Sequence, residues 1–284
     1  MADRKKPRVI KQKCIFCGSL GPLTQEHIWG DWLKAYVRAT INKHHFRSTR
    51  INPRGTPDTS NIALRAGSPL RSKVRVVCQK CNNGWLSVIQ KNAKTHLIPL
   101  IDGRATVLGK DAQQKIAAWC AMATMTAEFM KRDPETIAVP QHEREWLWKN
   151  GTAPPNWRIW IGRYQRHKWV GQWVHIALPV LESKDIPNDG TPTLPNTQVT
   201  TFVVGQLYIH VMSCLYPEIV TQWTWGWGPA PEVGRLLVQI SPLKESLIAW
   251  PPASLTDQSA DLIASAFDRY ITLLDRSILG LKLH

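Results

Sequence analysis

Two cysteine pairs with identical spacing are the residues of this chain best suited to bind a metal ion. Cys14 and Cys17 form the first pair, and Cys78 and Cys81 form the second. A Cys-x-x-Cys pair is typical of a tight turn whose two sulfurs reach one ion, and four thiolates satisfy tetrahedral Zn²⁺ with no open coordination position. We therefore expect a structural zinc site, which stabilises the surrounding fold but performs no reaction.

Three side chains near these pairs have the chemistry of a site that hydrolyses phosphodiesters. Glu26 and His27 lie between the pairs, and Asn82 directly follows the last cysteine. Carboxylate and amide oxygens are hard ligands for Mg²⁺ or Mn²⁺, and a neutral histidine can take a proton from water at physiological pH. The residues predict a catalytic divalent ion on Glu26 and Asn82, with His27 as general base. The alternative for the Glu-His pair is ordinary surface.

The positive charge of the chain is concentrated around these motifs. The net charge is +15, and residues 1–104 contain 20 Lys and Arg against 5 Asp and Glu, whereas residues 105–284 contain 16 of each. A concentrated positive field favours a polyanion, because binding phosphates releases condensed counterions. We expect DNA as the partner, with RNA not excluded; the alternative is a basic zinc module that binds nothing in particular. The candidate phosphate-binding residues are Arg47, Arg50, Arg54, Lys73, Arg75 and Lys80.

At the cysteines, Glu26-His27 and Asn82, the sequence resembles the zinc-knuckle branch of the HNH (ββα-metal) endonucleases, the endonuclease VII type. The resemblance covers about residues 10–95. It implies that Cys14, Cys17, Cys78 and Cys81 bind structural zinc, that His27 is the general base, and that Glu26 and Asn82 bind catalytic Mg²⁺ or Mn²⁺. Many members have a histidine after the last cysteine, where this chain has Asn82-Asn83. The residue that orients the base is therefore unassigned.

Periodicity predicts the elements that must position these residues. We expect an extended segment over 23–28, a short helix over 29–41, a long loop over 42–70, a strand over 73–77 and a helix that starts at Asn82 or Asn83. Later helices are expected over 110–132, 142–150 and 256–279, the last capped by Thr256. Five β-branched or aromatic runs predict strands over 158–164, 169–178, 198–205, 207–214 and 234–240. Gln90 lies on the helix after the second cysteine pair. Its amide oxygen could approach the metal, and the alternative is that the side chain packs against its neighbours.

These elements indicate an α+β protein with two domains. Residues 1–104 would form a small zinc-stapled ββα-metal nuclease domain, and residues 105–284 would form a larger α+β domain with an antiparallel sheet. No apolar run reaches the ~18 residues that span a bilayer, and no signal-peptide core follows the basic start, so we expect a cytoplasmic protein without a membrane partner.

The preferred function is therefore a metal-dependent HNH-type DNA endonuclease, with a role in anti-phage defence considered. One alternative is a zinc-containing nucleic-acid-binding protein without catalysis. In the other, the second domain senses a ligand or a regulatory protein partner and licenses the nuclease. The role of residues 105–284 is left open between target selection, homodimer formation and regulation.

Overall fold

The computed structural model describes residues 12–36, 43–51, 57–58, 62–66, 72–130, 136–182, 194–216, 231–266 and 281–283. They form helices and mainly antiparallel sheet, which confirms the predicted α+β class. Among the helices of these ranges, none combines the length and the apolar character that crossing a membrane requires.

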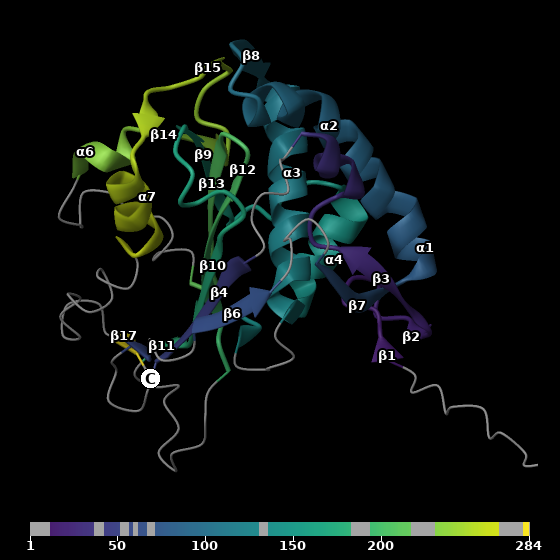
Figure 1. The fold of residues 1–284 in the computed structure, drawn as a ribbon. Helices are drawn as coiled ribbons and strands as arrows, with labels where there is room; N and C mark the ends of the chain where they lie inside the picture. Colours follow the sequence, from purple (N-terminus) through teal and green to yellow (C-terminus); the bar gives the residue numbers. More distant parts are fainter. Residues whose placement is uncertain are drawn as a thin grey trace, which may run out of the picture.

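A nine-stranded sheet forms the centre of the protein (Figure 1). Its main path, in spatial order, is β14 (Leu237–Ser241), β9 (Arg158–Tyr164), β13 (Leu207–Cys214), β12 (Thr197–Val204), β10 (Trp173–Leu178), β4 (Lys43–Ile51) and β5 (Pro57–Asp58). In addition, β16 (Ser254–Leu255) pairs with β9, and β6 (Ile62–Ala66) pairs with β4. All five strands expected after residue 155 are present. Every residue of β12 and β13 is buried, which suits their β-branched and aromatic composition.

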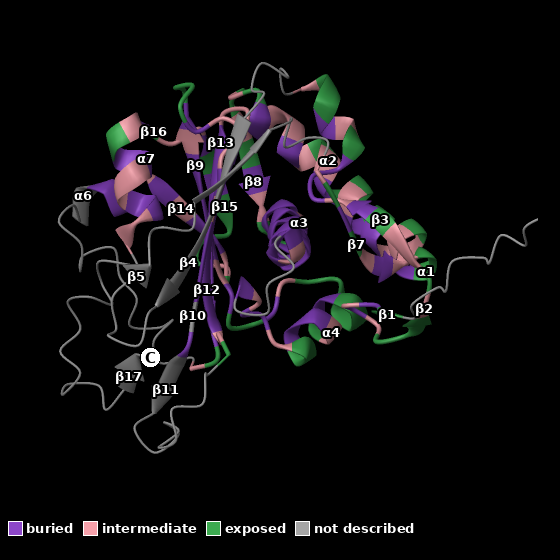
Figure 2. Cartoon of the chain, turned by 60° about the horizontal axis from the view of Figure 1, so that its bottom comes forward, coloured by how far each residue is buried: buried purple, intermediate pink, exposed green. Residues whose placement is uncertain are grey.

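Helix α3 (Lys110–Ala127) packs against one face of this sheet and is the core of the protein. Every side chain from Ile116 to Ala127 is buried, and many of them are small, so neighbouring elements approach it from all sides. Figure 2 shows α3 in the buried colour between the sheet and a further layer that contains α4 (Gln141–Asn150). Helix α2 (Ser87–Ile101) also packs along α3 (Figure 1).

Helix α3 ends five residues earlier than the pattern predicted. A 3₁₀ turn, η4 (Glu128–Met130), follows Ala127. The buried carboxylate of Glu128 accepts the main-chain N–H groups of Ala138 and Val139 at 3.0 and 3.2 Å. These bonds turn the chain at a residue that the apolar pattern could not mark as a stop.

The opposite face of the sheet is covered by α7 (Asp257–Ala264), with α6 (Pro231–Gly234) beside it (Figure 1). Thr256 caps α7 as predicted: its hydroxyl accepts the N–H of Ser259 at 3.1 Å, and the Ser259 hydroxyl accepts the N–H of Thr256. The helix closes at Ser265, and the predicted helix from residue 267 to 279 lies outside the described ranges.

The N-terminal elements pack on the α3 side. They are β1 (Gln12–Lys13), β2 (Leu20–Gly21), β3 (Leu23–His27), the 3₁₀ helix η1 (Asp31–Ala35), β7 (Lys73–Cys78), α1 (Gln79–Cys81) and the π-helical turn η3 (Asn82–Leu86), which continues into α2. The buried indole of Trp29 joins them to the central sheet, because its ring lies 6.3 Å from that of Trp173 and 6.1 Å from that of Phe202.

Two short strand pairs complete the described structure: β8 (Thr106–Gly109) with β15 (Leu247–Trp250), and β11 (Val180–Glu182) with β17 (Leu281–Leu283).

Residues 42–70 are not the single long loop that their composition suggested. They contain β4, β5 and β6, and β4 pairs in parallel with β10, a strand more than a hundred residues later. The open edge of β10 supplies the hydrogen-bond partners that organise β4, and local composition cannot reveal such a distant edge. The sheet and the apolar core therefore both contain residues from each side of position 104. The short helix expected over 29–41 is the 3₁₀ helix η1, and residues 37–42 lie outside the described ranges.

Candidate functional site

The four cysteines of the two Cys-x-x-Cys pairs meet at one point. Their sulfur atoms all lie within 4.8 Å of one another, and none forms a disulfide. Tetrahedral zinc with Zn–S bonds of ~2.3 Å separates its sulfurs by about 3.8 Å, and the Sγ atoms of Cys17 and Cys78 are 3.7 Å apart. The cluster can therefore hold a metal ion such as zinc, as predicted.

Charge also fits a cation at this cluster. Cys14 and Cys81 are buried, and burial raises the pKa of both thiols. Thiolates at such positions need a positive ion beside them, and a bound divalent ion supplies it.

Local main-chain bonds explain how the two pairs meet. Gly18 takes a positive φ of 68° and donates to the carbonyl of Cys14 at 2.9 Å, which closes the first turn. Ile15, inside that turn, donates to the carbonyl of Val76 at 3.0 Å. This bond ties the first pair to strand β7, which ends at Cys78.

The second pair is carried by a strand end and the first helical turn. The helical run begins at Gln79, with Cys78 as its N-cap, so it starts before the predicted Asn82 or Asn83. That shift has a physical reason, because one turn of helix brings Cys81 back beside Cys78. Asn82 follows within the helical run, at the start of η3.

Glu26 and His27 lie on β3, which pairs antiparallel with β7 in a two-stranded sheet, called the hairpin below although η1 and β4 to β6 separate its strands in the chain. In this register Glu26 is opposite Val74, and His27 is opposite Lys73. Neighbouring side chains of a strand point to opposite faces, so the pair straddles the hairpin. Glu26 is 6% exposed and faces the interior, whereas the His27 side chain is 23% exposed.

The Glu26 carboxylate has no hydrogen-bond or ion-pair partner within the described part of the chain. Burial alone raises its pKa to about 7. A buried acid without a partner is costly unless it is protonated or faces a cation. A positive ion next to Glu26 would therefore balance the negative charge of this carboxylate.

His27 lies under the influence of three charged neighbours. Burial lowers its pKa, the ammonium groups of Lys73 and Lys34 lower it further, and the carboxylate of Asp31 opposes these effects. Its Nε2 lies 3.3 Å from Oδ1 of Asp31, close enough for an ion pair when the ring is protonated, but makes no hydrogen bond to a described residue. Sequence reasoning missed Asp31, and its position four residues after His27 is the signal that could have found it.

Asn82 connects the helical run to strand β3. Its Nδ2 donates to the Thr24 hydroxyl at 2.9 Å and to the main-chain carbonyl of Gln25 at 3.2 Å. The amide nitrogen is thus occupied, and of the two polar atoms of the side chain only Oδ1 is left to bind a ligand.

Gln90 has a packing role, which settles the two interpretations of this residue. Its Oε1 accepts the indole N–H of Trp32 at 3.0 Å and that of Trp119 at 3.1 Å. One amide oxygen therefore joins η1, α2 and α3. Gly30 lies against the same oxygen, and a Cβ there would overlap it.

The predicted phosphate-binding residues fall into two groups. Lys73 and Arg75 on β7 and Lys80 on α1 are exposed near the hairpin. Arg47 and Arg50 belong to β4 of the central sheet, where only the main chain is described, and Arg54 lies outside the described ranges.

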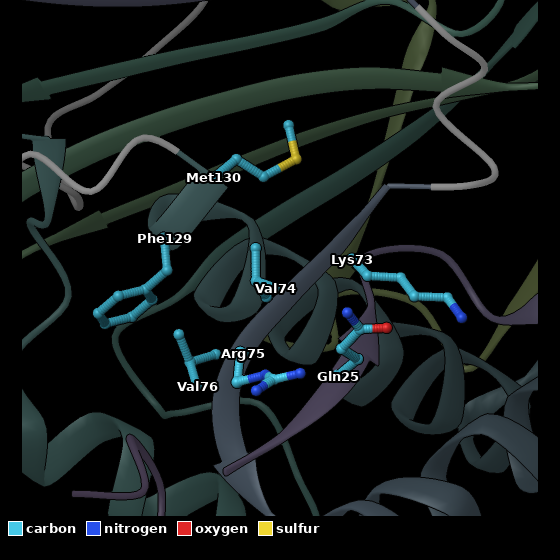
Figure 3. A pocket seen from close by; sticks show the side chains of 7 residues that line it. All are labelled: Gln25, Lys73, Val74, Arg75, Val76, Phe129 and Met130. Atoms are coloured by element: carbon cyan, nitrogen blue, oxygen red, sulfur yellow. The ribbon is translucent and has the colours of Figure 1, made fainter. Parts of the chain in front are cut away.

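A cavity of about 660 Å³ opens beside the hairpin (Figure 3). It is lined by Gln25 of β3, by residues 73–76 of β7, and by Phe129 and Met130 of η4. No sequence signal marks Phe129, because this residue falls inside a stretch predicted to be core helix.

No protein-family model, curated protein or solved structure matches this chain.

Proposed function

We propose that this protein is a metal-dependent endonuclease of the HNH type that hydrolyses phosphodiester bonds of DNA. The observation that carries the proposal is the buried carboxylate of Glu26, which has no partner among the described residues, next to His27 and on a hairpin tied to the four-cysteine cluster. A buried acid that lacks a counter-charge is the feature expected of a cation ligand.

Each residue has a separate task in this proposal. Zinc on the four cysteines would fix the hairpin relative to the helical run, in the manner of a ββα-metal domain. Glu26 and Oδ1 of Asn82 would hold Mg²⁺ or Mn²⁺. The bound ion would supply positive charge that stabilises the oxygen released from phosphorus. His27 would accept the proton of the attacking water once its Nε2, which is buried and lies 3.3 Å from Oδ1 of Asp31, is opened to that water.

The substrate side of the proposal rests on charge. The exposed Lys73 and Arg75 lie on the same face of the hairpin as His27, with Lys73 directly opposite it. They would hold phosphates on either side of the bond to be cut. Residues 1–104 would carry the chemistry, and residues 105–284 would select targets, form a homodimer or bind a regulatory protein, as in a phage-defence effector.

The test is nicking of supercoiled plasmid DNA by the full-length protein with and without added Mg²⁺ or Mn²⁺. Omitting these ions is preferable to a chelator, which would also remove zinc. We expect metal-dependent nicking that His27→Ala abolishes, while His142→Ala, an exposed histidine of α4, retains it. Wild-type nicking by His27→Ala would contradict the assignment of the base.

One observation favours a second candidate, a zinc-containing nucleic-acid-binding protein without catalysis. The amide nitrogen of Asn82 is bound to β3, so Asn82 already has a structural task that needs no catalytic ion. Tight DNA binding without nicking under any divalent ion would support this candidate.

A further inference from the structure

The cavity beside the hairpin has one charged side and one apolar side. Figure 3 shows Lys73 and Gln25 toward one end and Phe129, with Val76 near it, toward the other. Val74 and Met130 also line it. A volume of about 660 Å³ is within the range of sites that hold a small organic molecule.

The charged side is available for a ligand. Lys73 and Arg75 are both exposed, and neither forms an ion pair with an acidic group of the described residues. They alternate along β7, and in the β3 register they stand opposite His27 and Gln25. A phosphate bound by these two side chains would therefore lie on the face of the hairpin that presents His27.

The apolar side contains an aromatic ring held in a fixed position. The guanidinium carbon of Arg144 lies over the Phe129 ring, 4.9 Å from its centroid. Arg144 is itself buried: it forms an ion pair with the carboxylate of Glu128 and donates to the carbonyl of Met125 at 2.8 Å. Phe129 is only partly buried, so a ring anchored by these contacts still lines the cavity.

We propose that this cavity binds one unpaired nucleotide of the substrate, with its base against Phe129 and its phosphate on Lys73 and Arg75. The proposal deepens the proposed nuclease function and rests on it for the identity of the ligand. Aromatic rings stack on the faces of bases, and this contact tolerates any sequence. A base inside an intact duplex is already stacked on its neighbours, so the site selects single-stranded or locally opened nucleic acid.

The test compares the binding of labelled single-stranded DNA, single-stranded RNA and duplex DNA of about 12 nucleotides by fluorescence anisotropy, over a range of salt concentrations. Mg²⁺ and Mn²⁺ are left out so that no cleavage occurs. The full-length variants are Phe129→Leu, Phe129→Tyr and Arg75→Gln, and Lys149→Gln on α4 serves as the matched charge control. The DNA and RNA arms distinguish the two sources of an unpaired nucleotide.

We expect tighter binding of single strands than of duplex. Phe129→Leu should weaken single-strand binding about tenfold with an unchanged salt dependence, and Phe129→Tyr should bind like the wild type. Arg75→Gln should reduce the slope of log K against log salt by about 0.7, as expected for the loss of one phosphate contact to a single strand, and Lys149→Gln should leave that slope unchanged.

Equal single-strand affinity of Phe129→Leu and wild type would overturn the proposal, and so would equal affinity for single strands and duplex. These results are independent of catalysis. If Phe129→Leu weakens single-strand binding but the protein does not nick plasmid, the nucleotide-binding site is upheld and the nuclease activity is rejected. If the protein nicks plasmid but Phe129→Leu binds single strands like the wild type, only the nucleotide-binding site is rejected.

Discussion

The side-chain amide of Asn82 donates to the main-chain carbonyl of Gln25 across 3.2 Å, immediately before Glu26 in the chain. A residue next to the last cysteine thus fixes the strand that carries the Glu-His pair. The contact is one route by which a metal ion on the cysteines would order residues that do not touch it. It also separates two roles for Asn82, as a strand anchor through nitrogen and as a metal ligand through oxygen.

Substitution of Asn82 can distinguish these roles. Asn82→Ala removes both hydrogen bonds to β3 and should lower the free energy of unfolding by about 1–3 kcal/mol. Asn82→Asp keeps an oxygen ligand but loses both donors. If the ligand role dominates, Asp retains metal-dependent nicking and Ala does not. If nicking and thermal stability fall equally in the two variants, Asn82 acts only as an anchor.

Zinc content should depend on the clustered cysteines and not on the buried ones elsewhere. Cys78→Ser removes one of four ligands, so purified protein should contain substoichiometric zinc and melt at a lower temperature. Cys120→Ala, a buried thiol of α3 outside the cluster, should retain zinc. Elemental analysis together with circular dichroism checks this prediction. Full zinc content in Cys78→Ser would contradict a four-cysteine site.

Gly30→Ala should destabilise the contact between η1, α2 and α3. An added Cβ would overlap Oε1 of Gln90 and lie 2.5 Å from Nε1 of Trp32, so the hydrogen bond between those atoms would have to move. Overpacking of this kind costs about 1–3 kcal/mol, measured as a lower midpoint of urea unfolding. Gly21→Ala is the matched control, since no neighbouring atom lies within 4 Å of a Cβ there. Equal midpoints for the two variants would be evidence against the tight packing at Gly30.

Glu143 should make the stability depend on pH. Burial raises the pKa of its carboxyl to about 7, above the ordinary value of 4.5, although Trp157 donates to it at 2.8 Å. The folded state therefore holds the proton more tightly than the unfolded state. Its contribution is fully present below about pH 4.5 and is lost as the pH rises through about 7, with a maximum of about 3 kcal/mol.

The variant Glu143→Gln removes this titration and keeps an oxygen that can accept the Trp157 N–H. Urea unfolding of both proteins at about pH 5 and about pH 8 checks the sign. Wild type should lose more stability between the two values than Glu143→Gln. Parallel losses would show that the Glu143 carboxyl does not carry the pH dependence.

The sequence by itself determined the four-cysteine cluster, the fold class and most elements after residue 104. The spacing of Cys14, Cys17, Cys78 and Cys81 sufficed because a Cys-x-x-Cys turn aims two sulfurs at one point whatever surrounds it. The capping of α7 by Thr256 and the strands of the central sheet could also be predicted from the sequence. Caps and period-two patterns depend on only a few neighbouring residues.

Only the tertiary structure decided which distant residues meet. Strand β4 exists because β10 offers it an edge, Gln90 is fixed by indoles from η1 and α3, and Phe129 reaches the hairpin because Glu128 turns the chain at the end of α3. That Glu26 is buried without a partner among the described residues is likewise a result of how β3 packs. Such contacts join residues far apart in the chain, and a local pattern carries no information about the partner that a side chain meets after packing.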